Sequence, residues 1–289
     1  MRIEFKYSQI LDLVFHVLAF MQVDNDSNLY SKEYIDSFPF SVESGLIDKV
    51  SKIENYYNDN FDRLCMINFL PIYCNDLESL SSVLLSYDRF IGEDINNFVM
   101  PFIAILKDEH QQYADFWKIK IQNLSNEKNV LEKYIYDCLN DYRNIFDYYG
   151  KNAEVYFSVS LTCNGRGIYS DSSFSAIVPY PSTQEERKDC FFQLFHEYTH
   201  QFTDKLLNAN ISMTNGLHEL SENLVILADY FIFKRTDKEA ANAYLHWIIR
   251  NLGKENDTMD ETKFLNEFHV PKELMCSLNN EITGIYQSH

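Results

Sequence analysis

The sequence contains few of the residues that interrupt or disorder a chain. Only 8 of its 289 residues are glycine and 6 are proline, whereas 46% are hydrophobic and 15% are aromatic. This composition excludes a disordered, collagen-like or low-complexity chain. No repeat and no linker rich in proline, serine or glycine divides it. The sequence therefore predicts a globular protein, built as one large domain or as two closely apposed lobes.

Positive charge is also scarce. The 25 lysines and arginines are outnumbered by 43 aspartates and glutamates, which gives a formal net charge of −18. Such a surface repels phosphate backbones and anionic lipids, so we expect neither nucleic acid nor a membrane surface as a partner. The longest apolar runs, LVFHVLAFM and FVMPFIAIL, reach about half of the roughly 20 residues that span a bilayer. No membrane insertion is expected.

Cysteine is sparse and irregularly spaced. The six positions form neither a disulfide framework nor a Cys-x-x-Cys metal motif. They are Cys65, Cys74, Cys138, Cys163, Cys190 and Cys276. The N-terminal segment also lacks the basic start, apolar centre and small-residue cleavage site of a secretory signal. These observations predict reduced thiols and a cytoplasmic location.

The hydrophobic pattern changes near residue 150. Before that point apolar residues recur at helical spacing, over residues 10–21, 42–58, 77–90, 95–124 and 128–149. After it, residues 155–161 alternate between apolar and polar as in a strand. Asn164–Gly167 supplies turn residues, and Ser173–Pro179 reads as another extended segment. Together these segments predict a small antiparallel sheet.

We therefore expect an α+β fold that is predominantly α-helical. Residues 1–150 would form a helical N-terminal region without an assigned role, and residues 151–289 would form a second region with the sheet and further helices. One of these helices has two overlapping capping boxes at its start, in which Ser182 and Thr183 precede Glu185 and Glu186 by three residues. It should end near Leu207. Other helices are expected from residue 217, over residues 238–251 and from residue 271.

The capped helix contains the sequence FHEYTH, in which His196, Glu197 and His200 form a His-Glu-x-x-His pattern. Positions four apart lie one turn above each other on a helix, so both imidazoles can reach one Zn²⁺. Glu197 would lean over the open position of the metal, where a carboxylate can move a proton. With only 8 histidines in the chain, this spacing is improbable by chance.

The region over residues 153–232 resembles the gluzincin metallopeptidases. In that family a second helix supplies a glutamate as third zinc ligand, at a characteristic spacing beyond the motif. Eighteen residues lie between His200 and Glu219, which matches that spacing. The segment is similar to the ligand helix of peptidases of the angiotensin-converting-enzyme type and to that of the aminopeptidase branch. The resemblance implies a zincin-like catalytic half that binds one Zn²⁺ per chain through His196, His200 and Glu219.

Two neighbours of Glu219 are alternative third ligands. Glu222 lies one helical turn away, and His218 directly precedes Glu219. Members of the family usually carry an aspartate four residues after the ligand glutamate, where it accepts a hydrogen bond from a ligand histidine. Asn223 occupies that position here, and its amide oxygen can accept the same bond.

The resemblance also implies an edge strand above the metal that pairs with an extended substrate. The candidate is Ser173–Pro179, because prolines suit an edge strand; an ordinary hairpin covering the motif helix is the alternative. The substrate-facing residues would be Ser173, Phe174, Ser175, Ala176, Ile177 and Val178. The sequence does not choose an oxyanion-stabilising group among Tyr230, Tyr244, His246, His269 and Tyr286.

These residues predict hydrolysis of a peptide bond in a peptide or protein substrate, with Glu197 as general base and then general acid. The alternative is a zinc-binding protein that is weak or inactive as a peptidase and acts as an interaction or regulatory module. The sequence distinguishes neither endopeptidase from exopeptidase nor one oligomeric state from another.

Overall fold

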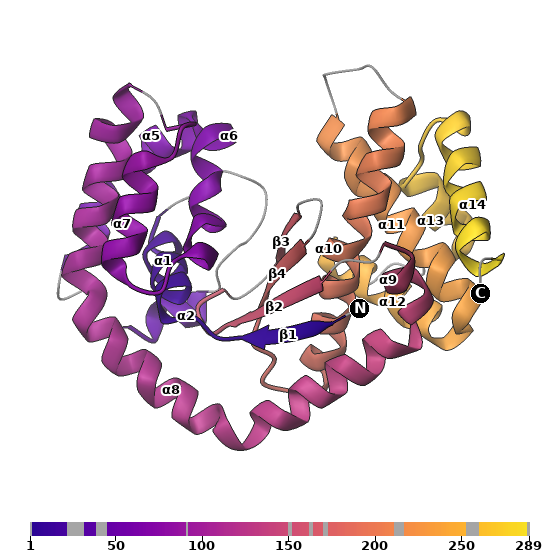
Figure 1. The fold of residues 1–289 in the computed structure, drawn as a ribbon, viewed down its shortest axis with the longest axis horizontal. Helices are drawn as coiled ribbons and strands as arrows, with labels where there is room; N and C mark the ends of the chain where they lie inside the picture. Colours follow the sequence, from indigo (N-terminus) through magenta and orange to yellow (C-terminus); the bar gives the residue numbers. More distant parts are fainter. Residues whose placement is uncertain are drawn as a thin grey trace.

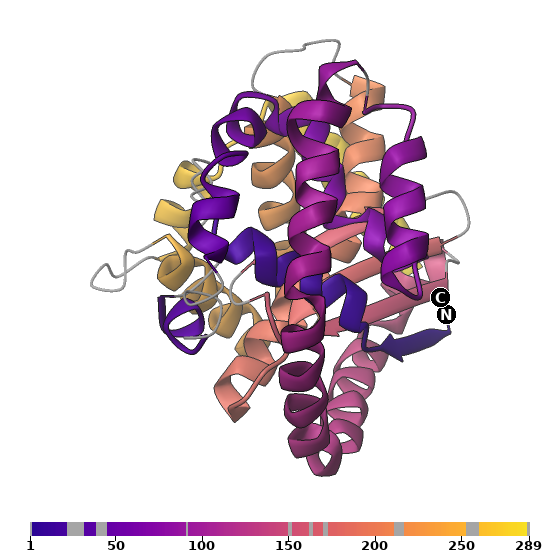
Figure 2. The same ribbon diagram turned by 90° about the vertical axis from the view of Figure 1, so that its left-hand side faces the viewer.

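Two helical lobes flank a four-stranded sheet, and one long helix runs along both lobes (Figure 1). The computed structural model describes residues 2–21, 32–38, 45–90, 92–149, 152–161, 164–169, 173–210, 217–252 and 260–287. Seen from the side of the N-terminal lobe, the helices of that lobe lie in front of the strands and the C-terminal helices lie behind them (Figure 2). The described part is mostly helical, as the sequence predicts.

The N-terminal lobe is built mainly from short helices. They are α1 (Gln9–Ala19), α2 (Lys32–Asp36), α4 (Leu46–Val50), α5 (Glu54–Asp59), α6 (Phe61–Leu64), the 3₁₀ helices η1 (Cys65–Asn68) and η2 (Leu70–Tyr73), α7 (Leu77–Ser86) and the π-helical turn η3 (Ile95–Val99). The C-terminal lobe contains α9 (Arg143–Tyr149), α10 (Gln184–Asn210), α11 (Leu217–Thr236), α12 (Lys238–Asn251), α13 (Glu261–Glu267) and α14 (Lys272–Gln287). The expected helix over residues 42–58 starts outside the described residues and is divided into α4 and α5.

Helix α8 (Met100–Asp141) joins the two lobes. It has 42 residues, which at 1.5 Å per residue give about 63 Å along an axis that bends between the lobes (Figure 1). The sequence predicts two helices here, over residues 95–124 and 128–149, whereas the structure has one helix up to Asp141 and the short α9 after it. No glycine or proline occurs between Pro101 and Tyr149, so the polar residues around position 126 do not interrupt the helix.

The sheet is mixed, not antiparallel as predicted. Its order is β1 (Ile3–Lys6), β2 (Asn152–Ser158), β4 (Ser173–Pro179) and β3 (Arg166–Tyr169). The pairs β1–β2 and β2–β4 are parallel, and only β3–β4 is antiparallel. The N-terminal strand thus enters the sheet beside a strand that follows it by about 150 residues in sequence. Alternation within one segment carries no information about such a partner.

The prediction that Ser173–Pro179 forms an edge strand is wrong. β4 pairs along both sides, and the edge beside it is β3. The physical reason lies in the side chains: residues 174–178 of β4 are buried without exception, as expected of a central strand. β3 has only four residues, none of them fully buried, and leaves Tyr169 exposed, as expected of a strand in the outer position.

The sheet separates two hydrophobic cores. On β2, Val155 and Phe157 belong to the C-terminal core, whereas Tyr156 between them belongs to the N-terminal core. α8 contributes to both, with Phe102 on the N-terminal side and Leu131 on the C-terminal side. The division between the cores therefore falls within α8, and not at the boundary near residue 150 that the change of sequence pattern suggests.

A buried carboxylate fastens the N-terminal lobe to this sheet. Asp12 of α1 is fully buried and accepts hydrogen bonds from the indole nitrogen of Trp117 on α8 (2.7 Å), from the backbone N–H of Val159 (3.1 Å) and from the hydroxyl of Ser158. Burial raises the pKa of Asp12 to about 7, although these donors oppose the shift. One side chain thus links α1, α8 and the end of β2.

None of the helices in the described residues is long and apolar enough to cross a membrane. The described cysteines, Cys65, Cys74, Cys138, Cys190 and Cys276, are free thiols, and Cys163 lies outside the described residues.

We predict that Asp12 makes the free energy of unfolding fall as the pH rises. Because the pKa of Asp12 is raised in the folded state, its contribution is fully present below about pH 4 and is lost as the pH approaches 7. The change is on the order of 4 kcal/mol, from 1.36 kcal/mol per pKa unit. Urea unfolding of the wild type and of Asp12→Asn at both ends of this range measures it. A difference between the two proteins that does not vary with pH would contradict the prediction.

Candidate metal centre

The motif helix α10 is fixed at its start and along one side. Thr183 and Glu186 form the predicted capping box: the N–H of Glu186 donates to the Thr183 hydroxyl and the N–H of Thr183 donates to the Glu186 carboxylate, both at 3.2 Å. Phe192 and Phe195 are buried in the C-terminal core against Phe233 of α11. The helix continues to Asn210, three residues beyond the predicted end.

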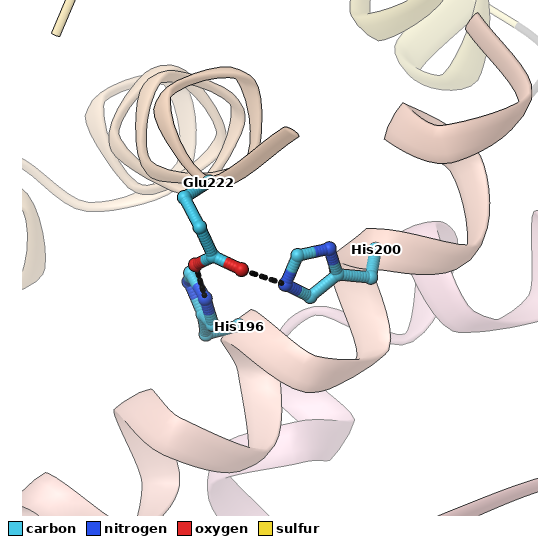
Figure 3. A group of neighbouring side chains, drawn as sticks. All are labelled: His196, His200 and Glu222. Carbon is cyan, nitrogen blue, oxygen red and sulfur yellow. Dashed lines mark hydrogen bonds and ion pairs between the residues drawn. The ribbon is translucent and has the colours of Figure 1, made fainter. Parts of the chain in front are cut away.

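His196 and His200 direct their Nε2 atoms at one carboxylate, that of Glu222 on α11 (Figure 3). His196 Nε2 lies 3.2 Å from one oxygen of Glu222, and His200 Nε2 lies 3.5 Å from the other. One ligand atom of each of the three residues lies within 4.8 Å of the other two. The histidine side chains are 14% and 16% exposed, so most of their surface is buried and a small part contacts solvent. Two imidazole nitrogens and one carboxylate oxygen are the donor set of many zinc sites.

The third member of this group is Glu222 and not Glu219. The sequence predicts Glu219 as ligand and keeps Glu222 as an alternative, and the structure brings only the alternative to the histidines. Glu219 has an exposed side chain in the first turn of α11, about 4.5 Å further along the helix axis. His218 is 90% exposed, with Nδ1 3.8 Å from Glu222. Twenty-one residues therefore separate His200 from the candidate ligand.

The other ring nitrogen of His196 faces a second carboxylate. Nδ1 lies 3.2 Å from Oδ2 of Asp229, a fully buried residue that also accepts a hydrogen bond from the Tyr244 hydroxyl (2.9 Å). Asp229 follows Glu222 by seven residues, two helical turns, so both carboxylates lie on one face of α11. Asn223, which the sequence favours for this role, makes no hydrogen bond to either histidine within the described part of the chain. The spacing of Glu222 and Asp229 is the signal that could have identified both.

His200 is held in a similar way. Its Nδ1 lies 3.7 Å from Oδ1 of Asp204, one turn further along α10. Asp204 accepts hydrogen bonds from the hydroxyls of Tyr169 (2.6 Å) and Ser221 (2.7 Å). Burial would raise the pKa of Asp204, but its bonds to His200, Tyr169 and Ser221 outweigh burial and lower it. Sequence reasoning missed Asp204, although its position four residues after His200 places it on the same helix face.

The charges of this group suit a cation. Burial would lower the pKa of His196, but the adjacent carboxylates of Asp229 and Glu222 outweigh burial and raise it well above 6.5. Burial likewise opposes ionisation of Glu222, yet the histidines lower its pKa to about 2. His196 therefore holds a proton on each ring nitrogen, and Nε2–H faces Glu222. A zinc ion would take the place of the proton on Nε2, while Nδ1–H keeps its bond to Asp229, as in histidines that bind zinc. The residues therefore fit a zinc ion.

Glu197 lies beside this group, under the edge strand β3. A Cβ atom placed on Gly167 would stand 2.6 Å from Oε2 and 3.1 Å from Cβ of Glu197, so the strand backbone and the helix touch there without room for a side chain. Burial raises the pKa of Glu197, while His196 and His200 oppose the shift. A carboxylate in these surroundings is suited to take up a proton.

The two glycines near β3 serve close packing and not a turn. The sequence assigns Asn164–Gly167 to turn chemistry, but Gly165 and Gly167 both have φ outside the left-handed range. A Cβ on Gly165 would stand 3.2 Å from Val178 of β4 and 3.5 Å from Gln193 of α10. Two residues of strand rise about 6.6 Å and four residues of helix about 6 Å. The strand and the helix thus keep in step from Gly165, which faces Gln193, to Gly167, which faces Glu197 four residues further along α10.

The five candidates for an oxyanion-stabilising group do not hydrogen-bond to the three residues of the cluster within the described part of the chain. Tyr244 donates to Asp229 and so supports His196 indirectly. The hydroxyl of Tyr286 pairs with Thr236, and Tyr230 is buried against Phe264. The remaining two candidates, His246 and His269, are exposed.

Comparison with models of protein families, with curated protein sequences and with solved structures finds no match to this chain. The interpretation of the site therefore rests on its own geometry.

We predict that the wild-type protein binds one zinc per chain and that Glu222→Ala loses it, whereas Glu219→Ala keeps it. Removing a ligand should weaken binding by more than the roughly 10- to 100-fold typical of losing a partner of a ligand. Elemental mass spectrometry after dialysis against a weak chelator measures this. The two variants remove the same side chain from the same helix one turn apart. Loss of zinc from Glu219→Ala alone would restore the ligand set predicted from sequence.

Proposed function

We propose that this protein is a zinc-dependent peptidase. The observation that carries the proposal is the convergence of both Nε2 atoms of a His-Glu-x-x-His helix on one carboxylate, with the glutamate of the motif beside them. His196, His200 and Glu222 would hold the ion. The resemblance to gluzincins enters this proposal with the third ligand moved from Glu219 to Glu222.

A zinc ion bound by these residues would supply a Lewis acid, which polarises a peptide carbonyl and makes water acidic enough to attack near neutral pH. Glu197 accepts the proton of the attacking water and then gives it to the leaving amine. Its raised pKa suits both tasks, because a general base and acid works best when its pKa lies near the working pH. Asp229 and Asp204 hold the two imidazoles in the tautomer that leaves Nε2 free to bind.

The edge strand β3 supports a peptide as the substrate. Its outer side carries backbone groups that no other strand in the described residues pairs with, and Gly167 brings this edge against Glu197. An extended peptide can add to such an edge by main-chain hydrogen bonds. The strand proposed for this role is therefore Arg166–Tyr169 in place of Ser173–Pro179. A cytoplasmic location is part of the proposal and rests on the irregularly spaced free cysteines.

We predict that Glu197→Gln retains zinc and loses peptide hydrolysis. The amide keeps the size of the side chain but cannot take up a proton, so kcat should fall by about 10²- to 10⁴-fold. Zinc content and turnover of a mixed peptide library, read by mass spectrometry, measure the two effects separately. If zinc-loaded wild type leaves every peptide intact, the chain is a zinc-binding protein without peptidase activity, which is the alternative that the sequence leaves open.

A second prediction concerns the fit between β3 and the proposed base. Gly167→Ala places a methyl group 2.6 Å from Oε2 of Glu197, closer than van der Waals contact allows, so the carboxylate must move. Displacement of a catalytic group by about 1 Å can cost on the order of 10²-fold in rate. We expect kcat to fall accordingly while zinc content stays at the wild-type value.

The matched control is Gly284→Ala on α14, where the added methyl group meets nothing within 4 Å. This variant should keep full activity, since alanine in a helix is favourable. Wild-type kcat in Gly167→Ala would show that Glu197 does not need its present position.

A further inference from the structure

One arginine beside the candidate centre has no carboxylate partner among the residues that the structure describes. Arg166 is half-buried on β3, and its only hydrogen bond in the described part of the chain runs from Nη1 to the carbonyl oxygen of Gly165 (2.9 Å). In a chain with 43 acidic and 25 basic residues, acidic partners are abundant. Three arginines pair with them in the described residues: Arg63 with Asp94, Arg187 with Glu127 and Arg250 with Asp189. A half-buried guanidinium that lacks such a partner is available for a ligand.

Arg166 lies on the edge strand, on the face of the sheet opposite to the one that contacts Glu197. It precedes Gly167, the residue in contact with Glu197, and its Cα pairs with that of Ile177. Ile177 belongs to the N-terminal core, so the two side chains lie on the face of the sheet that the N-terminal lobe covers. The charge of Arg166 acts on Glu197 in one lobe and on Tyr57 in the other. It therefore stands between the lobes, next to the place where a paired peptide would lie.

We propose that Arg166 binds a carboxylate of the peptide substrate, either the C-terminal carboxylate or the side chain of an aspartate or glutamate near the scissile bond. The proposal rests on the peptidase function proposed above and names the substrate class of the same site. A guanidinium presents two parallel N–H donors that match the two oxygens of a carboxylate. An acidic protein would otherwise repel a peptide with a carboxylate at this place, so the positive charge of Arg166 determines which peptides bind.

The experiment measures binding, so it does not depend on turnover. Zinc-loaded Glu197→Gln and the double variant Glu197→Gln with Arg166→Gln are immobilised and exposed to a peptide library. Each peptide is present with a free C-terminal carboxylate and as its C-terminal amide, and in a further arm each aspartate and glutamate is replaced by asparagine and glutamine. Mass spectrometry reads the retained peptides. The matched control is Arg143→Gln in the same background, which removes the same charge from an exposed position at the start of α9.

We expect acidic forms to be retained over their neutral forms by about 10- to 100-fold when Arg166 is present, the range for a hydrogen-bonded charge pair. This ratio should fall to about one with Arg166→Gln and stay unchanged with Arg143→Gln. The arm in which the ratio falls identifies the C-terminal or the side-chain carboxylate as the group bound. Equal retention of acidic and neutral forms in the presence of Arg166, or retention of neither, would overturn the proposal.

The outcome is separable from that of the peptidase proposal. Zinc-loaded wild type that hydrolyses acidic and neutral peptides at the same rate would contradict the role of Arg166 and leave the peptidase function intact. Retention of acidic peptides through Arg166 without hydrolysis by the wild type would support the binding site and contradict the peptidase. A loss of zinc in Arg166→Gln would assign the residue to the metal centre and overturn its role in substrate binding.

Discussion

Each imidazole of the candidate centre has two ring nitrogens to satisfy in a place that little water reaches. His196 and His200 solve this with carboxylates on both sides: Nδ1 faces Asp229 or Asp204, and both Nε2 atoms face Glu222. Unpaired polar groups in such surroundings cost free energy, so the carboxylates fix the orientation of both rings. All five residues come from α10 and α11. The packing of these two helices therefore determines the centre, and the aromatic contacts between them are part of its construction.

The sheet meets the centre through the backbone of β3. Because Gly165 and Gly167 carry no side chains, the strand lies directly against α10, and Tyr169 at its end bonds to the carboxylate that holds His200. A peptide added to β3, as we propose, would thus be positioned relative to Glu197 by main-chain contacts with this strand. The same strand carries Arg166 on the face toward the N-terminal lobe. One segment of four residues thus contacts Glu197, bonds to Asp204 beside His200 and presents a positive charge.

The sequence predicts the parts of the site that depend on local geometry. The spacing of His196, Glu197 and His200 and the capping box of α10 follow from the helical repeat, and the structure has both the helix and the cap. The third member of the cluster does not follow from it, because Glu219 and Glu222 lie on neighbouring turns of α11 and only the packing of α11 on α10 selects between them. Asp229 could have been found from its spacing to Glu222, but only after that selection.

The fold likewise has features that the sequence predicts and features that it does not predict. Some helices were predictable because they have their own periodicity and caps, as for α12, whose observed bounds match the predicted ones, whereas the predicted helices over residues 42–58 and 95–149 are divided differently in the structure. Strand order was not, because pairing joins segments that are remote in sequence. The apolar character of Ser173–Pro179 on both faces does indicate a central strand, and the weight given to its prolines led to the wrong position. Gly167 illustrates a further limit, since a glycine required by a neighbouring helix looks in the sequence like a glycine required by a turn.

The pairing of β1 with β2 has a consequence for how the chain folds. Ile3 is opposite Ala153, so this part of the sheet closes only after both ends of a segment of about 150 residues have met. Closing such a segment costs conformational entropy that local helices do not repay, and folds with contacts this remote form slowly. The lobes are also interlaced: β1 precedes the N-terminal lobe in sequence but belongs to a sheet shared with the C-terminal lobe, and α8 contributes to both cores. A cut in the chain between the lobes would therefore separate β1 from its sheet or divide the core helix α8. We expect the two lobes to unfold as one cooperative unit.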